Sequence, residues 1–280
     1  MATFLVLSAG QLLASKHIEA GKLVPWDYSP MRIPSQIFLP AVAPGRAHAR
    51  QSGAGHVLYP ILVFLHGAGD GPFHVMNRQS LPSLLLNNES FAATFPFVAI
   101  FPCSTCGGPP GGWLSTNFEK VDMLIDLVVR WHHGDPERVI LTGQSMGGGG
   151  LWKYAAARPG KFAALVPVCA ALSPSPSLAK AACCTDGACC PSTWVFHGAN
   201  DGSVPVSLSD KWVDALRSIN REVRYTRYEW APPPPMVEFQ MMTGHASYEL
   251  AYRDEQLYEW MLRQRRCTSC AATMPSTTPL

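Results

Sequence analysis

The sequence predicts an α/β domain in which a mostly parallel central sheet carries helices on both faces. One observation is that several short segments are apolar without alternation, which is typical of strands buried on both faces. Another is that segments with apolar residues at helical spacing lie between those strands, and this order produces a parallel sheet. The chain has 280 residues, of which 47% are hydrophobic, so it is long enough to bury one large core.

The predicted strands are short apolar runs rich in β-branched and aromatic residues. They cover residues 59–65, 97–101, 139–141, 163–166 and 193–196, and a further strand-like segment covers residues 223–228. Residues 41–56 indicate a loop between early strands. We therefore expect a single domain over residues 1–266 with its core at residues 57–263, followed by a small, polar and disordered tail at 267–280.

Three segments carry apolar residues at helical spacing. In the first, Thr116-Asn-Phe-Glu119 has the pattern of a capping box, so we expect a helix to begin there. The apolar positions are Phe118, Val121, Leu124, Ile125 and Val128 in the first segment, Leu208, Trp212, Val213, Leu216 and Ile219 in the second, and Leu250, Leu257, Tyr258 and Met261 in the third. A further helix is expected to begin after Ser145 and to end at Arg158-Pro159-Gly160.

The strongest candidate nucleophile is Ser145, which lies in Gly143-Gln144-Ser145-Met146-Gly147. This G-x-S-x-G segment follows a predicted strand and precedes a predicted helix. In that context the chain turns sharply and presents the serine outward, and only glycines clear the neighbouring backbone. The spacing therefore predicts a nucleophile elbow.

A serine hydroxyl is a weak nucleophile, so it needs a histidine base and a carboxylate that orients the base. Asp201 and His245 both follow predicted strands, in the order nucleophile, acid, base that accompanies such an elbow. His66 is a rival base, but it precedes the serine and is expected to bond within its own loop. Asp186 is a rival acid, although no strand precedes it.

The reaction also needs N–H groups that stabilise an oxyanion in the transition state. The segment Leu65-His-Gly-Ala-Gly-Asp70 ends an early strand with small residues, so its backbone has room to approach a substrate oxygen. We predict the N–H groups of Ala68 and Met146 as the two donors.

Two irregular segments, residues 172–192 and 231–243, lie between strand ends, where an α/β domain places its binding loops. We expect both to form walls of a substrate pocket. The residues expected to contact substrate are Trp113, Gln144, Phe239, Met241 and Met242. For Phe239 and the two methionines, ordinary packing is the alternative.

Five segments together resemble the α/β-hydrolase superfamily: Leu-His-Gly-Ala-Gly-Asp, Arg-Val-Ile-Leu-Thr-Gly-Gln-Ser-Met-Gly-Gly, Phe-Ala-Ala-Leu-Val-Pro-Val-Cys, Trp-Val-Phe-His-Gly-Ala-Asn-Asp and Gly-His-Ala-Ser-Tyr. They are most similar to its phospholipase/carboxylesterase branch, with the related feruloyl-esterase, polyhydroxybutyrate-depolymerase and predicted-peptidase proteins. The resemblance spans about residues 57–263. It implies the α/β-hydrolase fold, Ser145, Asp201 and His245 as the triad, and no metal or organic cofactor.

The expected function is hydrolysis of a small-molecule carboxylic ester through an acyl-enzyme intermediate. A serine peptidase of the prolyl-oligopeptidase type and an acyl-thioesterase are the alternative enzymes, although no propeller repeat is present in the sequence. A hydrolase-fold binding protein is the non-enzymatic alternative. The chain departs from the family pattern in its long segment 231–243 and in its Cys-Cys loop, so the resemblance does not carry over a substrate.

The formal net charge is +2 with no long run of either sign, which gives no indication of a nucleic-acid groove. No stretch approaches the roughly 20 apolar residues that span a bilayer, so no transmembrane segment is expected. Residues 1–15 resemble a signal peptide only weakly, because no basic residue precedes their apolar part. We expect a cytoplasmic protein, with secretion as the alternative; the oligomeric state stays open.

Nine cysteines are many for a cytosolic enzyme. Cys103-x-x-Cys106 and Cys267-x-x-Cys270 have the spacing of zinc knuckles, but they are too far apart in the chain for a usual site. Disulfides within loops or plain thiols are the preferred interpretation, both there and for the Cys-Cys pairs at residues 183–184 and 189–190.

Overall fold

The computed structural model describes residues 18–26, 33–45, 48–71, 73–106, 112–183, 190–219 and 221–267. Its centre is one sheet in the order β1-β2-β5-β4-β6-β7-β8-β9, with β3 added beside β4. The strands are β1 (Leu23–Trp26), β2 (Ser35–Phe38), β3 (Arg50–Gln51), β4 (Val57–Leu65), β5 (Val98–Pro102), β6 (Gly134–Gln144), β7 (Ala164–Val168), β8 (Ser192–Gly198) and β9 (Val223–Tyr228).

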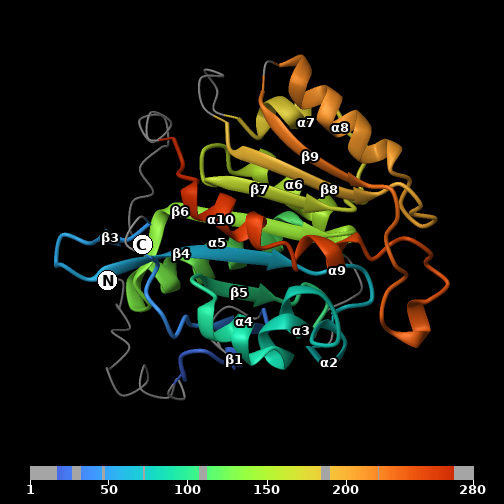
Figure 1. Ribbon diagram of the computed structural model, residues 1–280. Helices are drawn as coiled ribbons and strands as arrows, with labels where there is room; N and C mark the ends of the chain where they lie inside the picture. Colours follow the sequence, from blue (N-terminus) through green and yellow to red (C-terminus); the bar gives the residue numbers. More distant parts are fainter. Residues whose placement is uncertain are drawn as a thin grey trace, which may run out of the picture.

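Six neighbouring strands of the sheet run parallel, namely β5, β4, β6, β7, β8 and β9. By contrast, β1 and β2 form an antiparallel edge beside β5. The mostly parallel sheet predicted from the sequence is therefore confirmed. The carboxyl ends of the parallel strands lie on the right in Figure 1. No residue range was predicted for the strands before the loop at 41–56. β1 and β2 lie there and extend the ordered core to residues before position 57, because all four residues of β2 are buried.

Helices cover both faces of the sheet, as predicted. They are α2 (Phe73–Met76), α3 (Ser80–Asn87), α4 (Glu89–Thr94), α5 (Ser115–Trp131), α6 (Met146–Ala157), α7 (Pro176–Ala181), α8 (Ser207–Ser218), α9 (Ser247–Ala251) and α10 (Glu255–Arg263), with a short 3₁₀ helix at Val237–Phe239. The apolar sides of α5, α6 and α8 share one core cluster. Those of α3, α9 and α10 share the other and lie toward the viewer in Figure 1.

β4 explains why the predicted strands are apolar without alternation. Ile61, Val63 and Leu65 belong to one core cluster, whereas Leu62 and Phe64 belong to the other. Successive side chains of a strand point to opposite faces of a sheet, so a strand covered on both faces needs apolar residues at every position.

Two predicted helix boundaries were wrong. α5 begins at Ser115, and Asn117 Oδ1 accepts the N–H of Leu114 at 3.0 Å, so Asn117 serves at the position expected for Glu119. The predicted helix that contained both Leu250 and Leu257 is two helices, α9 and α10. Asp254 separates them because its carboxylate accepts the N–H of Gln256 at 2.9 Å and caps α10.

Of the cysteines that the structure describes, all but Cys169 are disulfide-bonded, so the preferred disulfide interpretation applies to them and the zinc alternative does not. Cys103 is bonded to Cys106, Cys183 is bonded to Cys190, and Cys267 is also disulfide-bonded. A sulfur in a disulfide has no thiolate to offer a metal. Cys184, Cys189, Cys270, Asp186, the signal-like segment 1–15 and residues 268–280 of the expected tail lie outside the described residues.

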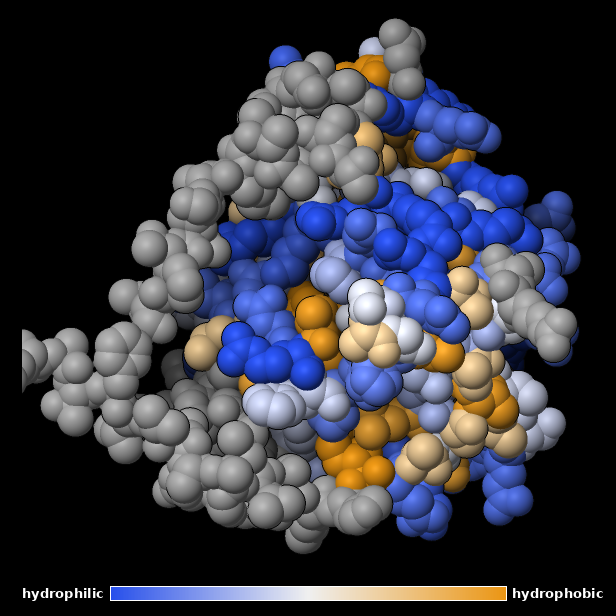
Figure 2. Space-filling model, turned by 90° about the vertical axis from the view of Figure 1, so that its left-hand side faces the viewer, coloured by the Kyte–Doolittle hydropathy of each residue, from blue (hydrophilic) through white to orange (hydrophobic). Residues whose placement is uncertain are grey.

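An ion pair is buried at the amino end of β6. Asp135 accepts a bond from Arg138 Nε at 2.7 Å, and neither side chain is exposed. Arg50 adds bonds of 2.9 and 3.0 Å to the same carboxylate, and Arg138 also donates to the carbonyl oxygens of His48 and Leu58. Figure 2 shows this end of the molecule, where hydrophilic side chains cover much of the surface between smaller hydrophobic groups.

Candidate active site

Ser145 lies in a sharp turn between β6 and α6. Its φ of 52° is in the left-handed region, which non-glycine residues seldom adopt outside strained functional turns. Glycines at both sides make this turn possible. A Cβ on Gly143 would lie 2.5 Å from the Gly147 carbonyl oxygen, and a Cβ on Gly147 would lie 2.0 Å from that of Leu65. The elbow geometry that the sequence predicts is thus present.

The structure brings Ser145, His245 and Asp201 together. His245 Nε2 lies 2.9 Å from Ser145 Oγ, and His245 Nδ1 lies 2.8 Å from Asp201 Oδ2. Because a carboxylate only accepts hydrogen bonds, Nδ1 carries the proton and Nε2 is free to accept the serine proton. The three residues have the relative positions that proton transfer from the serine requires.

Asp201 is held in its ionised form by several donors. Its Oδ1 accepts the N–H groups of Ser203 and Val204, both at 2.9 Å. Burial by itself raises the pKa of Asp201, but the hydrogen bonds from His197 and His245 outweigh it and hold the pKa well below its usual range. The carboxylate therefore stays charged and orients the imidazole of His245.

His197 contacts the same Asp201 oxygen, Oδ2, as His245 does. Its Nε2 lies 2.9 Å from the Val204 carbonyl oxygen and 3.2 Å from Asp201 Oδ2, so Nε2 carries the proton. Its Nδ1 accepts from Ser209 Oγ at 2.7 Å. No motif in the sequence indicated this contact, which only the folded loop creates.

The loops that carry the acid and the base are bonded to each other. Asp201 follows β8 and His245 precedes α9, and the Gly202 N–H donates to the Thr243 carbonyl at 2.9 Å. Gly244 has a φ of +72°, and a Cβ there would lie 2.2 Å from the Asn200 carbonyl oxygen. This close approach needs glycine, and it fixes His245 beside Asp201.

The ring of His66, the rival base, is hydrogen-bonded to Gly67 and Ser104, whereas the ring bonded to Ser145 is that of His245. His66 is fully buried, its Nδ1 donates to the Gly67 carbonyl at 2.8 Å, and its Nε2 accepts the Ser104 N–H at 3.1 Å. Burial lowers its pKa to about 4, so the ring is neutral near pH 7. Its role is to join the loop after β4 to the loop closed by Cys103 and Cys106.

Of the two predicted oxyanion donors, Met146 follows Ser145 in the chain, and Ala68 follows Gly67, which lies close to the serine. Gly67, next to Ala68, approaches the serine so closely that a Cβ on it would lie 3.5 Å from Ser145 Cβ. Met146 begins α6, where N–H groups have no partner within the helix. Within the described ranges, neither the Ala68 nor the Met146 N–H is bonded to another backbone group outside helices and strands. Both remain proposals as oxyanion donors.

Two expected substrate contacts are corrected. Trp113 is 3% exposed, and its indole N–H donates to the His66 carbonyl at 3.0 Å. Gln144 is 2% exposed, and its amide is bonded to Asp70 at 3.1 Å and to Ser80 Oγ at 2.5 Å. Both side chains are occupied inside the protein, so they hold the loops around the site and do not face a substrate.

The segment before His245 supplies the remaining expected contacts. Phe239 lies against the loop after β4, because a Cβ on Gly69 would be 3.0 Å from its ring. Met242 is half-buried, and its carbonyl accepts the His245 N–H at 3.2 Å. Met241 is 88% exposed, so it does not pack in a pocket wall as expected.

Cys169 adds a thiol to this region. A ligand atom of Cys169 lies within 4.8 Å of those of Asp201 and His245, a set that resembles a metal site. Burial strongly raises the pKa of the Cys169 thiol, so the thiolate that a metal needs is disfavoured. Both nitrogens of His245 are already bonded to Asp201 and Ser145. The chemistry of the set therefore fits proton transfer better than metal binding.

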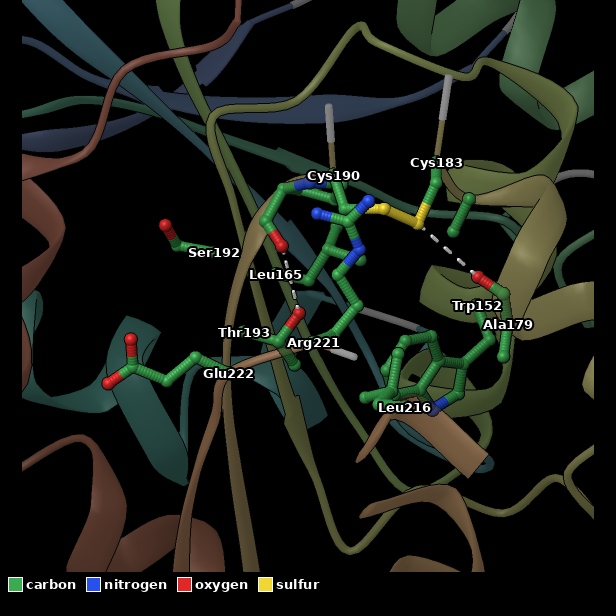
Figure 3. Close-up of a pocket in the computed structure, with 12 residues that line it drawn as sticks. Trp152, Leu165, Ala179, Cys183, Cys190, Ser192, Thr193, Leu216, Arg221 and Glu222 are labelled. Atoms are coloured by element: carbon green, nitrogen blue, oxygen red, sulfur yellow. Dashed lines mark hydrogen bonds between the residues drawn. A yellow bond between two sulfur atoms is a disulfide. The ribbon is translucent and has the colours of Figure 1, made fainter. Parts of the chain in front are cut away.

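A cavity of about 180 Å³ lies away from this site, at the amino ends of β7 and β8 (Figure 3). The disulfide of Cys183 and Cys190 lines it, together with Trp152 and the start of β8. No residue of the candidate site takes part in it.

In comparisons with known proteins, the chain matches solved structures but no family model and no curated protein. A thermostable esterase matches with a TM-score of 0.64 and 25% identity, over 87% of this chain and 62% of that one. The chain thus spans 62% of the length of that esterase.

Two further matches share the fold at lower identity. Fluorophosphonate-binding serine hydrolase F of Staphylococcus aureus matches with a TM-score of 0.60 and 18% identity, over 88% of this chain and all of that one. An acylaminoacyl peptidase matches with a TM-score of 0.51 and 13% identity, over 92% of this chain and 43% of that one. In the part of the chain that the structure describes, no helix has the length and apolarity to cross a membrane.

Proposed function

We propose that this chain, which has the α/β-hydrolase fold, is a serine hydrolase that cleaves carboxylic esters through an acyl-enzyme intermediate. One observation carries the proposal: Ser145 Oγ, the His245 ring and the Asp201 carboxylate form an unbroken hydrogen-bonded series with distances of 2.9 and 2.8 Å. This series makes a half-buried turn serine nucleophilic at neutral pH. The likeness to a thermostable esterase points to the same chemistry.

In the proposed mechanism, Ser145 Oγ attacks the ester carbonyl carbon while His245 Nε2 takes the serine proton. The N–H groups of Ala68 and Met146 stabilise the oxyanion. The tetrahedral intermediate then collapses, the C–O bond to the alcohol breaks, and His245 returns the proton to the alcohol oxygen. A water molecule, deprotonated by His245, hydrolyses the acyl-enzyme in the same two steps and restores Ser145.

The proposed substrate is a small ester with a short to medium acyl chain or an aromatic acyl group. Phe239 and Met242 are the proposed apolar contacts, since the ring of Phe239 lies beside the proposed oxyanion loop. A peptide amide and an acyl-thioester are the alternative substrates, because the same triad chemistry serves all three leaving groups.

The test is a substrate screen with Ser145→Ala as its control. We expect wild-type protein to hydrolyse p-nitrophenyl and feruloyl esters faster than matched thioesters and peptide amides. Ser145→Ala should lose on the order of 10⁴- to 10⁶-fold in rate. A fluorophosphonate probe should label wild-type protein at Ser145 alone. Ester hydrolysis at the wild-type rate by Ser145→Ala would contradict the proposal.

The disulfides favour the secreted alternative over the cytoplasmic one, because disulfides persist in oxidising compartments. Among the cysteines of the described ranges, Cys169 alone is free, and it is buried. A thiol assay on protein purified from its native source, denatured without reductant, checks this. Thiols that react at Cys103 or Cys183 would favour a reducing compartment.

A further inference from the structure

A second buried carboxylate lies beside the catalytic series and takes no part in it. Asp70 is 4% exposed and lies in the loop between β4 and α2. Its Oδ2 accepts the Gly67 N–H at 2.9 Å and Gln144 Nε2 at 3.1 Å, and its Oδ1 accepts Gln79 Nε2 at 2.6 Å. Burying a carboxylate and surrounding it with three donors costs free energy. We therefore expect the position of Asp70 to matter to the structure or to the chemistry.

The three donors connect Asp70 to the elements that carry the nucleophile and the base. Gln144 immediately precedes Ser145 at the end of β6. Gln79 precedes α3, and its Oε1 accepts the hydroxyl of Tyr248 on α9 at 2.9 Å. Tyr248 lies three positions after His245, so the network joins the oxyanion loop to both catalytic segments.

The bond from the Gly67 N–H to Asp70 determines which N–H groups of this loop are available to a substrate. Because the Gly67 N–H is bonded to Asp70, it is not available to a substrate oxygen, whereas the next N–H along the chain, that of Ala68, is not used in this way. Gly67 also lies against Ser145, where a Cβ would be 3.5 Å from the serine Cβ. A small movement of Gly67 would therefore displace the proposed oxyanion donor relative to the nucleophile.

We propose that Asp70 is a positioning residue that anchors Gly67 and thereby directs the Ala68 N–H at the oxyanion formed on attack by Ser145. The inference rests on the proposed function, because it assigns a residue that acts in the same reaction. Among the described residues, Asp70 is hydrogen-bonded to Gly67, Gln79 and Gln144 and to neither the nucleophile nor the base. It acts through the backbone of the loop, so its loss affects stabilisation of the transition state more than binding of the substrate.

The test measures kcat, KM and the Ki of an aryl boronic acid, which adds to Ser145 as a tetrahedral adduct, in Asp70→Ala and Asp70→Asn. We expect Asp70→Ala to lower kcat by about 10²-fold, because misplacement by about 1 Å has an effect of this size. KM should stay within about threefold, and the Ki should rise by about the same factor as kcat falls. Asparagine keeps one accepting oxygen but turns an N–H₂ group toward one of the former donors, so about a tenfold loss is expected.

Asp122→Asn is the matched control. Asp122 also accepts bonds from several donors, namely Tyr154, Arg158 and Lys161, but none of these belongs to the site. This variant should lower the unfolding midpoint while keeping the wild-type kcat and boronic-acid Ki. A purely structural role for Asp70 would give the same pattern in Asp70→Asn.

Folded Asp70→Asn with wild-type kcat and Ki would therefore overturn the inference, even where Asp70→Ala does not fold. A rise in KM alone would overturn it as well, since that outcome indicates lost substrate binding. These failures are distinct from failure of the proposed function, in which wild-type protein itself would not hydrolyse esters or Ser145→Ala would retain activity.

Discussion

The two ends of the sheet each hold a buried carboxylate, and the partners of the two differ. At the amino end, Asp135 is bonded to Arg138 and Arg50, whose guanidinium groups keep their protons at any physiological pH. At the carboxyl end, Asp201 is bonded to His197 and His245, and an imidazole ring, unlike a guanidinium, can accept and return a proton during a reaction. The identity of the partner, more than burial, decides whether a buried acid serves the structure or the chemistry.

Burial alone does not distinguish the structural carboxylate, Asp135, from the carboxylate of the candidate site, Asp201. Neither the Asp135 nor the Asp201 side chain has exposed surface, and both accept backbone or side-chain N–H groups. The substitutions below test the comparison from the largest expected effect to the smallest.

Asp201→Asn should reduce kcat by about 10⁴-fold, because an amide no longer holds the protonated Nδ1 of His245 or stabilises the charged ring. We expect the urea midpoint at neutral pH to fall as well, because the lowered pKa of Asp201 means that its charge stabilises the folded state, but the loss of kcat should persist in the folded fraction. Steady-state kinetics on a p-nitrophenyl ester, with a urea titration of the same preparation, measure both quantities. Loss of the fold without a specific loss of kcat would place Asp201 in the same class as Asp135.

Asp135→Asn should show the reverse. Removing one partner of a buried ion pair leaves the other charge uncompensated, which costs about 3 to 5 kcal/mol of unfolding free energy. The kcat of the folded fraction should equal that of wild type, because Asp135 and its arginines lie at the far end of β6 from Ser145. A large decrease in the kcat of Asp135→Asn under conditions in which the variant is fully folded would contradict a purely structural role for Asp135.

The pH dependence of stability should have opposite signs for Asp70 and Asp201. Burial raises the pKa of Asp70 from 3.8 to about 6, although hydrogen bonds from Gly67, Gln144 and Gln79 and the charge of His245 oppose it. Between about pH 4 and pH 6 the folded state binds more protons at Asp70 than the unfolded state, so this group makes stability fall as pH rises. The pKa of Asp201 is lowered, so its contribution is present above the unfolded pKa and is lost as pH falls.

Urea titrations of wild type, Asp70→Asn and Asp201→Asn between pH 3.5 and 7 measure these contributions as differences. Relative to wild type, Asp70→Asn should gain up to about 3 kcal/mol as pH rises from about 4 to about 6, the equivalent of about two pKa units. Relative to wild type, Asp201→Asn should lose least at the acid end of the series. Parallel curves for the two variants would contradict the assigned directions.

The smallest expected effect concerns the segment before His245. Phe239→Ala should lower kcat/KM for an aromatic acyl ester by about tenfold, since a lost apolar contact of this kind costs about 1 to 3 kcal/mol. Met241→Ala is the matched control, because Met241 is 88% exposed and its loss should leave kcat/KM unchanged. Equal effects of the two substitutions would indicate that neither side chain selects the substrate.

Local sequence signals determined the elbow and the strands of the sheet. The turn at Ser145 depends on its own glycines, and an apolar run such as that in β4 needs only burial on both faces to become a strand. The order of Ser145, Asp201 and His245 could be read for the same reason, because each follows a strand whose end is visible in the sequence. The short edge strands β1 and β2 lacked this signal, so the residues that form them were not predicted.

What only the tertiary structure decided is which side chains meet between loops. Asp70 and Tyr248 join the same network through Gln79 although they are far apart in the chain, and Trp113 is bonded to the His66 carbonyl and does not face a substrate. Periodicity and motif spacing report on the backbone near one residue. A hydrogen bond between loops depends on the paths of both, and the packing of helices on the sheet sets those paths.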